Sequence, residues 1–244
     1  MEVSSECSGI AKQLQDWVRA SKSRNHNEAL QIARSAASAA PNCAKAHYFL
    51  AVGLSRTGHP GSAIASYERS IQLDDSDSMA FYNLGIALGE IGRADDAITA
   101  YRKSIAIRDS YADAYVNLAA LLWGKNADDE ALELARRAVS PAPGDAVAHG
   151  CLAHSLQRKG CLNEAIDEYW ATIALDKAHA PAYRGLGICY SILGQFDNAA
   201  EKFAEAFRLD PGNPTIRGMK AHHYMTRLQI GNAVRALLGR TKPS

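Results

Sequence analysis

The chain has 244 residues, of which 47% are hydrophobic and 22% charged, and its formal net charge is +1. This apolar content suffices for a folded core, whereas the near-neutral charge supplies no concentrated basic face for binding nucleic acid. The longest uncharged apolar stretch, around residues 116–123, is too short to span a bilayer, so membrane insertion is not expected. Residues 1–7 lack the basic and apolar organisation of a secretory signal, and we expect a cytoplasmic protein.

An alanine recurs every 34 residues along almost the whole chain. Such a fixed period indicates a solenoid, in which each repeat buries its apolar face against its neighbours. A small residue at one place in every repeat indicates that two helix backbones pass close to each other there. The seven alanines are Ala29, Ala63, Ala97, Ala131, Ala165, Ala199 and Ala233.

Setting these alanines at position 20 divides the chain into successive repeats. Residues 1–9 are expected to form an N-terminal tail. Residues 10–43 (repeat 1) are expected to be a capping repeat, because Asp16 and Trp17 depart from the pattern of later repeats. Five in-phase repeats follow at 44–77, 78–111, 112–145, 146–179 and 180–213 (repeats 2 to 6). Residues 214–239 are expected to form a partial repeat that caps the C-terminal end, and residues 240–244 a tail.

Each repeat is predicted to be a pair of helices. Its apolar residues fall three, four or seven positions apart, which is the helical period and not that of a strand. Between the two apolar stretches lies a residue suited to the left-handed conformation that ends a helix. These residues are Gly58, Gly92, Asn126, Gly160 and Gly194. The sequence therefore predicts an all-α fold, an α-solenoid of about six helix pairs followed by a C-terminal capping pair.

Two stretches show the repeat pattern most clearly. They are Phe81-Tyr82-Asn83-Leu84-Gly85 followed by Gly92, Ala97 and Tyr101, and Tyr183-Arg184-Gly185-Leu186-Gly187 followed by Gly194, Ala199 and Phe203. The pattern resembles the tetratricopeptide repeat (TPR) family over roughly residues 10–240. The resemblance implies a right-handed superhelix of helix pairs, in which the first helices line a concave groove. It implies a groove that holds a peptide or a partner's helix, and it implies no catalytic chemistry.

The expected groove comes from positions 2, 5, 6, 9, 12 and 13 of each first helix. Its N-terminal half is aromatic and apolar, and its C-terminal half is more polar and basic. Exposed Tyr, Phe, Trp and Met residues gathered on one concave surface are the types that anchor partners, although some of these side chains could instead pack against neighbours. We therefore expect a non-enzymatic scaffold that binds a protein or peptide. The expected groove residues are Tyr48, Phe49, Val52, Tyr82, Asn83, Ile86, Val116, Asn117, Trp123, His154, Arg158 and Arg184.

Two binding modes of the family can be compared with these positions. Readers of acidic chaperone tails carry Lys, Asn and Arg across three first helices. The equivalent places here hold Tyr48, Val52, Asn83, Asp113 and Asn117, so that clamp is absent. O-linked N-acetylglucosamine transferase carries an asparagine at position 6 of repeat after repeat, which holds peptide backbone. This chain keeps Asn83 and Asn117 alone, so at most two positions of that asparagine pattern are present.

No set of residues indicates a catalytic, cofactor or metal site. Cys151 and His154 lie three apart on one helix face, but no third group is present to orient them. The same pair has too few ligands for structural zinc. The cysteines are odd in number and follow no framework spacing, so we expect reduced thiols. They are Cys7, Cys43, Cys151, Cys161 and Cys189.

Two alternative functions stay open. Trp170 falls at position 25, which is expected to face the convex side, and a bare tryptophan there is unusual. It favours a structural protein that assembles into homo-oligomers through its convex face or its ends. The third possibility is an accessory arm that docks to an enzyme or membrane complex.

Overall fold

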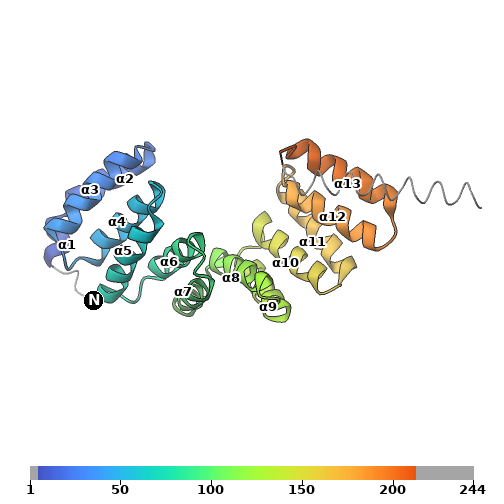
Figure 1. Ribbon diagram of the computed structural model, residues 1–244, viewed down its shortest axis with the longest axis horizontal. Helices are drawn as coiled ribbons and strands as arrows, with labels where there is room; N and C mark the ends of the chain where they lie inside the picture. The colour runs from blue at the N-terminus through green and yellow to red at the C-terminus, as the bar shows by residue number, and fades with distance from the viewer. Residues whose placement is uncertain (1–4, 213–244) are drawn as a thin grey trace, which may run out of the picture. The chain divides into compact units, whose positions relative to one another are not determined.

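The computed structural model describes residues 5–212, and every element in that range is a helix (Figure 1). The prediction of an all-α helical repeat fold is confirmed. The expected capping pair at 214–239 and the tail at 240–244 lie outside the described residues. In the part of the chain that is described, no helix is long and apolar enough to cross a membrane.

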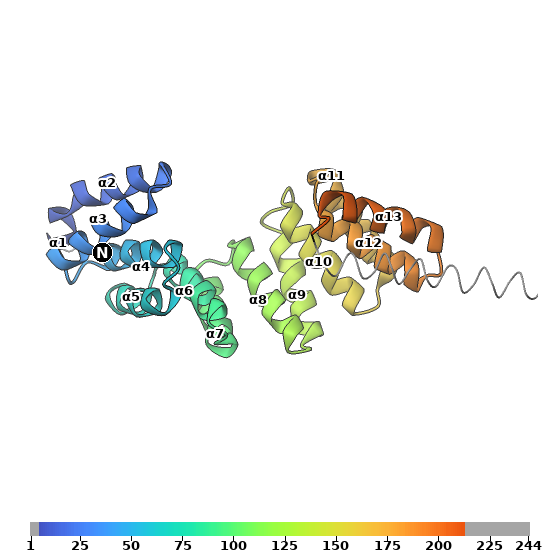
Figure 2. The ribbon, with the colours of Figure 1, turned by 45° about the horizontal axis from the view of Figure 1, so that its top comes forward.

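A short helix, α1 (Ser5–Gly9), precedes six helix pairs, and each pair occupies one 34-residue repeat. In repeats 1, 2, 3, 5 and 6 the two helices of the pair lie side by side, and the first helices α4 and α6 also contact each other (Figure 2). The pairs are α2 (Ala11–Lys22) and α3 (His26–Ala39), α4 (Ala44–Arg56) and α5 (Pro60–Leu73), α6 (Ser78–Glu90) and α7 (Ala94–Ile107), α8 (Ala112–Gly124) and α9 (Asp128–Val139), α10 (Ala146–Arg158) and α11 (Leu162–Leu175), and α12 (Ala180–Ile192) and α13 (Phe196–Leu209).

The chain divides into two compact units, an N-terminal unit of residues 1–121 and a C-terminal unit of residues 122–244. The division falls inside α8, so that Asn117 belongs to the N-terminal unit and Trp123 to the C-terminal unit.

The turn inside each repeat contains a left-handed residue, as predicted. The four turn glycines have φ angles between 74° and 79°, and Asn126 takes the same place with φ 56°. In repeat 1 this place is held by Arg24, with φ 58°, which the sequence pattern did not single out. Arginine in the left-handed backbone conformation carries a steric cost that glycine does not.

The small residues of the repeat are explained by close packing. Each position-20 alanine in the described range is at most 2% exposed. Two residues of a second small column, Gly85 and Gly187 at position 8, each lie beneath an aromatic ring of the second helix. A Cβ built on Gly85 would lie 2.7 Å from the ring of Tyr101, and one on Gly187 would lie 2.5 Å from the ring of Phe203. Both distances are shorter than any normal contact, so the rings require glycine at these two places.

The expectation that all cysteines are reduced is wrong for one pair. Cys7 and Cys43 form a disulfide, with their Cα atoms 5.2 Å apart, while Cys151, Cys161 and Cys189 are free. Helix α1 lies outside the repeat and brings Cys7 to the N-cap of α4, where Cys43 is fully buried. Ile10 joins Cys43 in the same apolar cluster. An odd count with irregular spacing therefore did not exclude a single bridge.

Candidate binding surface

The expected groove residues of the N-terminal unit come from α4, α6 and the first part of α8. All of them are partly exposed, neither buried in the core nor fully in solvent. Two hydrogen bonds join successive repeats through them. The Asn83 Nδ2 group donates to the Tyr48 hydroxyl at 2.9 Å, and the Asn117 Nδ2 group donates to the Tyr82 hydroxyl at 3.1 Å. We call these two contacts the Tyr–Asn pairs.

The Tyr–Asn pairs hold two tyrosine rings in place from neighbouring helices. A tyrosine hydroxyl can accept one hydrogen bond and still donate its own proton. The asparagine carbonyl oxygen is likewise a separate acceptor from the amide that donates to the tyrosine. Each pair therefore offers one donor and one acceptor side by side. The asparagines, expected from the family resemblance to hold peptide backbone, here donate to tyrosines of the preceding repeat.

Buried tyrosines of the second helices support these rings from behind. The Tyr48 ring lies 6.1 Å from that of Tyr67, and the Tyr82 ring lies 5.8 Å from that of Tyr101, measured between centroids. Tyr111 packs on Tyr82 from the following turn, with ring centroids 4.7 Å apart. These tyrosines thus form a pair in repeat 2 and a cluster of three in repeat 3.

The tyrosine hydroxyls at this surface stay protonated. Burial raises the pKa of Tyr48, and the negative charge of Asp77 raises it further, against the opposing hydrogen bond from Asn83. Burial likewise raises the pKa of Tyr82, with Asp113 as the second cause. Both hydroxyls are therefore donors throughout the physiological pH range.

Phe49 and Val52 are partly used in packing. The Phe49 ring stacks on Trp17 of α2, with centroids 4.2 Å apart and planes 26° from parallel. Trp17 is 7% exposed and is the centre of an apolar cluster that Val52 also contacts. The tryptophan that made repeat 1 look atypical therefore fills the space beside α4. Its indole Nε1 has no hydrogen-bond partner in the described structure.

In the C-terminal unit, Trp123 and His154 form an aromatic contact. Their ring centroids are 4.4 Å apart with the planes at 76°, an edge-to-face arrangement. The Trp123 indole Nε1 donates to the hydroxyl of Ser155 at 3.1 Å. Burial lowers the pKa of His154, and the charges of Arg158 and Arg184 lower it further, while Asp128 opposes them. His154 is therefore neutral at pH 7.

The two arginines of this surface differ in their partners. The Arg158 Nε group donates to Asp128 Oδ1 at 2.5 Å, and its Nη2 group donates to Asn126 Oδ1 at 3.3 Å. Arg184 is partly exposed and forms no hydrogen bond or ion pair with any other residue of the described range. Of these two expected groove arginines, Arg158 is therefore held by its neighbours.

The Cys151 thiol beside His154 is poorly suited to act as a nucleophile. Its side chain is 4% exposed, and burial raises its pKa to about 12. The thiol is therefore protonated at neutral pH, whereas a nucleophilic cysteine needs its thiolate form. Across residues 5–212 no group of three potential ligands is placed to hold a metal ion.

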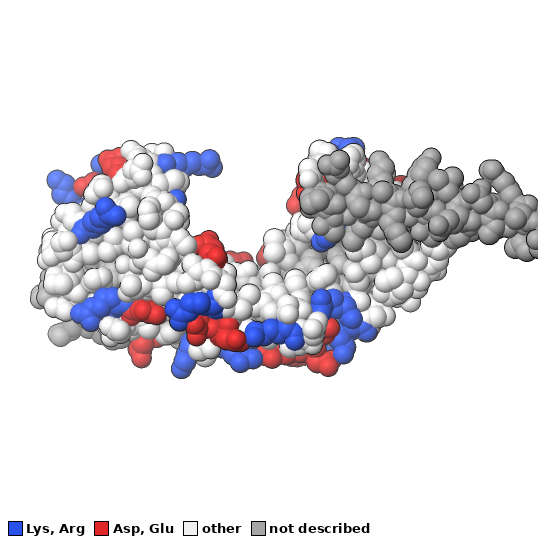
Figure 3. All heavy atoms as spheres, viewed as in Figure 1, with Lys and Arg blue, Asp and Glu red and all other residues white. Residues whose placement is uncertain are grey.

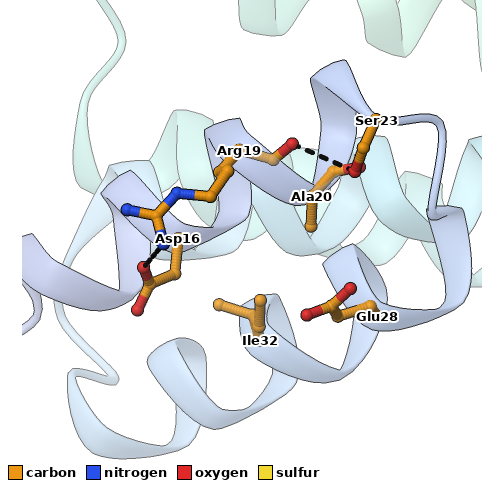
Figure 4. A pocket seen from close by; sticks show the side chains of 6 residues that line it. All are labelled: Asp16, Arg19, Ala20, Ser23, Glu28 and Ile32. Carbon is orange, nitrogen blue, oxygen red and sulfur yellow. Dashed lines mark hydrogen bonds and ion pairs between the residues drawn. The ribbon is translucent and has the colours of Figure 1, made fainter.

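Two pockets lie away from the expected groove residues. One, of about 350 Å³, lies between α2 and α3 (Figure 4). Asp16 and Arg19 form an ion pair at 3.4 Å on its α2 side. The other, of about 460 Å³, lies beside α11, α12 and α13. The lining residues are Asp16, Arg19, Ala20, Ser23, Glu28 and Ile32 for the first, and Trp170, Tyr183, Glu201, Lys202, Ala204, Glu205 and Arg208 for the second.

The Trp170 side chain contacts two other residues. It is 40% exposed, but the Lys202 Nζ atom lies 4.9 Å from the ring centroid, a cation–π contact. Its indole Nε1 also donates to the Tyr190 hydroxyl at 3.4 Å. On the face of each unit seen in Figure 3, positive and negative side chains are interleaved without a large patch of one sign.

Comparisons with known proteins identify the repeat. A family model of the tetratricopeptide repeat matches residues 19–78, 53–112 and 82–146, and a second one matches residues 180–213. No curated protein matches the chain.

Several solved structures share the fold. YrrB, described as a TPR protein with an unusual peptide-binding site, is 23% identical, with a TM-score of 0.64 over 78% of this chain and 97% of that one. The pilF protein of Pseudomonas aeruginosa is 18% identical, with a TM-score of 0.77 over 89% of this chain and 99% of that one. Cut9–Hcn1, an APC/C hetero-tetramer, is 15% identical, with a TM-score of 0.74 over 88% and 42%. At these identities the likeness shows the fold alone. Because the first family model alone matches more than half of the residues, the chain belongs to the tetratricopeptide repeat family.

Proposed function

We propose that this protein is a non-enzymatic scaffold that binds a peptide or partner helix on the surface of its first helices. The observation that carries the proposal is the repetition of the Tyr–Asn pair, Tyr48 with Asn83 and Tyr82 with Asn117. Both tyrosine rings are partly exposed, held by neighbouring repeats and backed by buried tyrosines. A held ring loses little side-chain freedom on binding, which favours affinity.

The chemistry of the pair suits a polypeptide ligand. The ring offers apolar area, the hydroxyl offers a donor for a carbonyl, and the asparagine carbonyl offers an acceptor for an N–H group. A peptide backbone presents that donor and acceptor at every residue. The peptide-binding site named for the similar protein YrrB supports the same class of ligand.

The test is affinity capture from an extract of the source cells, followed by titration of the purified partner. The chain is compared with Tyr48→Ala and Tyr82→Ala, each expected to weaken binding by about 1–3 kcal/mol, as for aromatic anchors. Tyr82→Phe, which keeps the ring and removes the hydroxyl, should lose less. Trp170→Ala is the control, since Trp170 belongs to a different surface. Full binding by the tyrosine variants together with loss in the control would refute the proposal.

Self-association through α11 to α13 is a second candidate function. Trp170 is half-exposed beside a pocket of about 460 Å³, which a second molecule could fill. Light scattering across a concentration series tests it. A dimer that Trp170→Ala dissociates would support self-association, and a monomer at all concentrations would exclude it.

Whether the Cys7–Cys43 disulfide persists in the cell depends on the compartment in which the protein resides. Disulfides persist in oxidising environments, whereas cytosolic thiols are kept reduced. The cytoplasmic location expected from the sequence therefore stays a prediction. Trapping the thiols in intact cells tests it, because a cytoplasmic protein should be recovered with Cys7 and Cys43 reduced.

A further inference from the structure

The first helices of the repeats differ in how their N-terminal ends are held. Asp77 precedes α6 and Asp145 precedes α10, and each carboxylate accepts a hydrogen bond at 2.9 Å from the backbone N–H group two residues on. Cys43 precedes α4 with a similar extended backbone, but its side chain forms no capping hydrogen bond. Its sulfur is instead joined to Cys7. A covalent bridge therefore holds the start of α4 where a hydrogen bond holds the starts of α6 and α10.

Packing connects this bridge to residues of the expected groove. Cys43 belongs to an apolar cluster against which Leu50 packs, and Leu50 also packs against the second cluster, which contains Trp17. Trp17 in turn stacks on Phe49, with ring centroids 4.2 Å apart. Tyr48 and Phe49 lie on α4 itself, one turn beyond its start. A change at Cys43 therefore reaches these two side chains through their own helix and through Leu50.

A reductant can reach one sulfur of the bridge. Cys7 is partly exposed, whereas Cys43 is fully buried, so a thiolate attacks at the Cys7 sulfur. A bond forms between a dithiol and Cys7 Sγ as the Cys7–Cys43 bond breaks, and Cys43 leaves as a thiolate that takes up a proton. The second thiol of the reductant then displaces Cys7 as a thiol. The dithiol is oxidised to a disulfide, and the protein gains two electrons and two protons.

We propose that the Cys7–Cys43 disulfide is a redox switch, and that its reduction by a dithiol loosens the first turn of α4. In the reduced protein Cys43 keeps a thiol, which is a weak acceptor and a poor replacement for the carboxylates that cap α6 and α10. Helix α1 also loses its bond to the start of α4. The Ser70 hydroxyl still donates to the Ala44 carbonyl at 2.9 Å, so α4 loosens at its start and does not detach.

The switch regulates one end of the binding surface. This consequence rests on the proposed function, because it requires that Tyr48 and Phe49 contact a partner. A ring on a loosened turn loses more freedom on binding, so the reduced protein binds more weakly through these two side chains. Tyr82 lies on α6, whose start is capped by a carboxylate, and its position does not depend on the bridge.

The experiment is amide hydrogen exchange of the full chain, read residue by residue by NMR, before and after treatment with dithiothreitol. Reduction is expected to speed exchange at residues 47–49 by about fivefold, the usual effect of losing a helix N-cap. Residues 149–151, at the same place in α10, should be unaffected. Cys7→Ser should exchange like the reduced protein and ignore the reductant. Cys161→Ser, which removes a free cysteine, is the control and should respond like wild type.

Asp145→Ala supplies a matched reference for the size of the effect. It removes the hydrogen-bonded cap of α10 and leaves the bridge intact, so it should speed exchange at residues 149–151 by a similar factor in both redox states.

Two results would overturn the proposal. One is unchanged exchange at residues 47–49 on reduction. The other is an equal acceleration in α4 and α6, which would make the bridge a general stabiliser of the N-terminal unit. Because exchange is measured without a partner, failure of the switch is distinguishable from failure of the proposed function. Unchanged exchange together with partner binding that needs Tyr48 would remove the switch and leave the scaffold proposal standing.

Discussion

Breaking the Cys7–Cys43 disulfide should destabilise the N-terminal end of the protein. The bridge joins residues separated by 36 positions. In the chain-entropy model a closed loop of that size lowers the entropy of the unfolded chain by about 13 cal/mol/K, or about 4 kcal/mol at 25 °C. This magnitude is an upper figure, because residual structure in the unfolded chain reduces it. Helix α1 depends on the bridge most, since a five-residue helix is not stable alone.

The assay is urea unfolding followed by circular dichroism, with and without a dithiol reductant. Cys7→Ser is the preferred variant, because Cys7 is partly exposed whereas Cys43 is fully buried and its replacement would also disturb the core. Cys161→Ser, a partly exposed free cysteine, is the control. Cys7→Ser and reduction should shift the unfolding midpoint equally, and the reductant should not affect Cys7→Ser further. Unchanged unfolding on reduction would refute the stabilising role of the loop.

Three further predictions concern packing and pH. Ala97→Leu places a large side chain at a site that is fully buried, so it should cost about 1–3 kcal/mol in unfolding experiments; a wild-type melting temperature would contradict close packing there. Gly187→Ala should lower the melting temperature, because its Cβ would lie 2.5 Å from the Phe203 ring, and Phe203→Leu in the same chain should recover part of the loss. The pKa of His154 is lowered in the folded protein, so the unfolded chain binds its proton more readily. Stability should therefore fall as the pH drops below the ordinary histidine value of 6.5, and His154→Gln should lessen that fall; an identical pH dependence would exclude it.

The helix pairs could be predicted from the sequence because the 34-residue spacing constrains every repeat at once. The left-handed turn residues and the buried position-20 alanines follow from the same spacing. The first helix and its disulfide could not be predicted in this way, because Cys7 lies outside the repeat and one bridge gives no periodic signal.

The sequence could predict which residue types line the candidate site, but it could predict only some of the contacts that they make. The sequence does contain a signal for the Tyr–Asn pairs. Tyr48 and Asn83 are separated by 35 positions, and so are Tyr82 and Asn117. No signal in the sequence predicted that Phe49 stacks on Trp17, because Trp17 stands where the repeat pattern expects a small residue. The pairing of Arg158 with Asp128 depends on how α10 lies against the start of α9, which spacing alone does not give.

The contact between Gly85 and the Tyr101 ring makes two positions, sixteen residues apart, mutually dependent. A side chain gained first at position 85 meets the ring at 2.7 Å, whereas a smaller residue gained first at position 101 removes the obstacle. The order of substitution therefore decides which intermediate folds. Among close relatives, the two columns should change together, and a helix pair transplanted into another solenoid should keep both members.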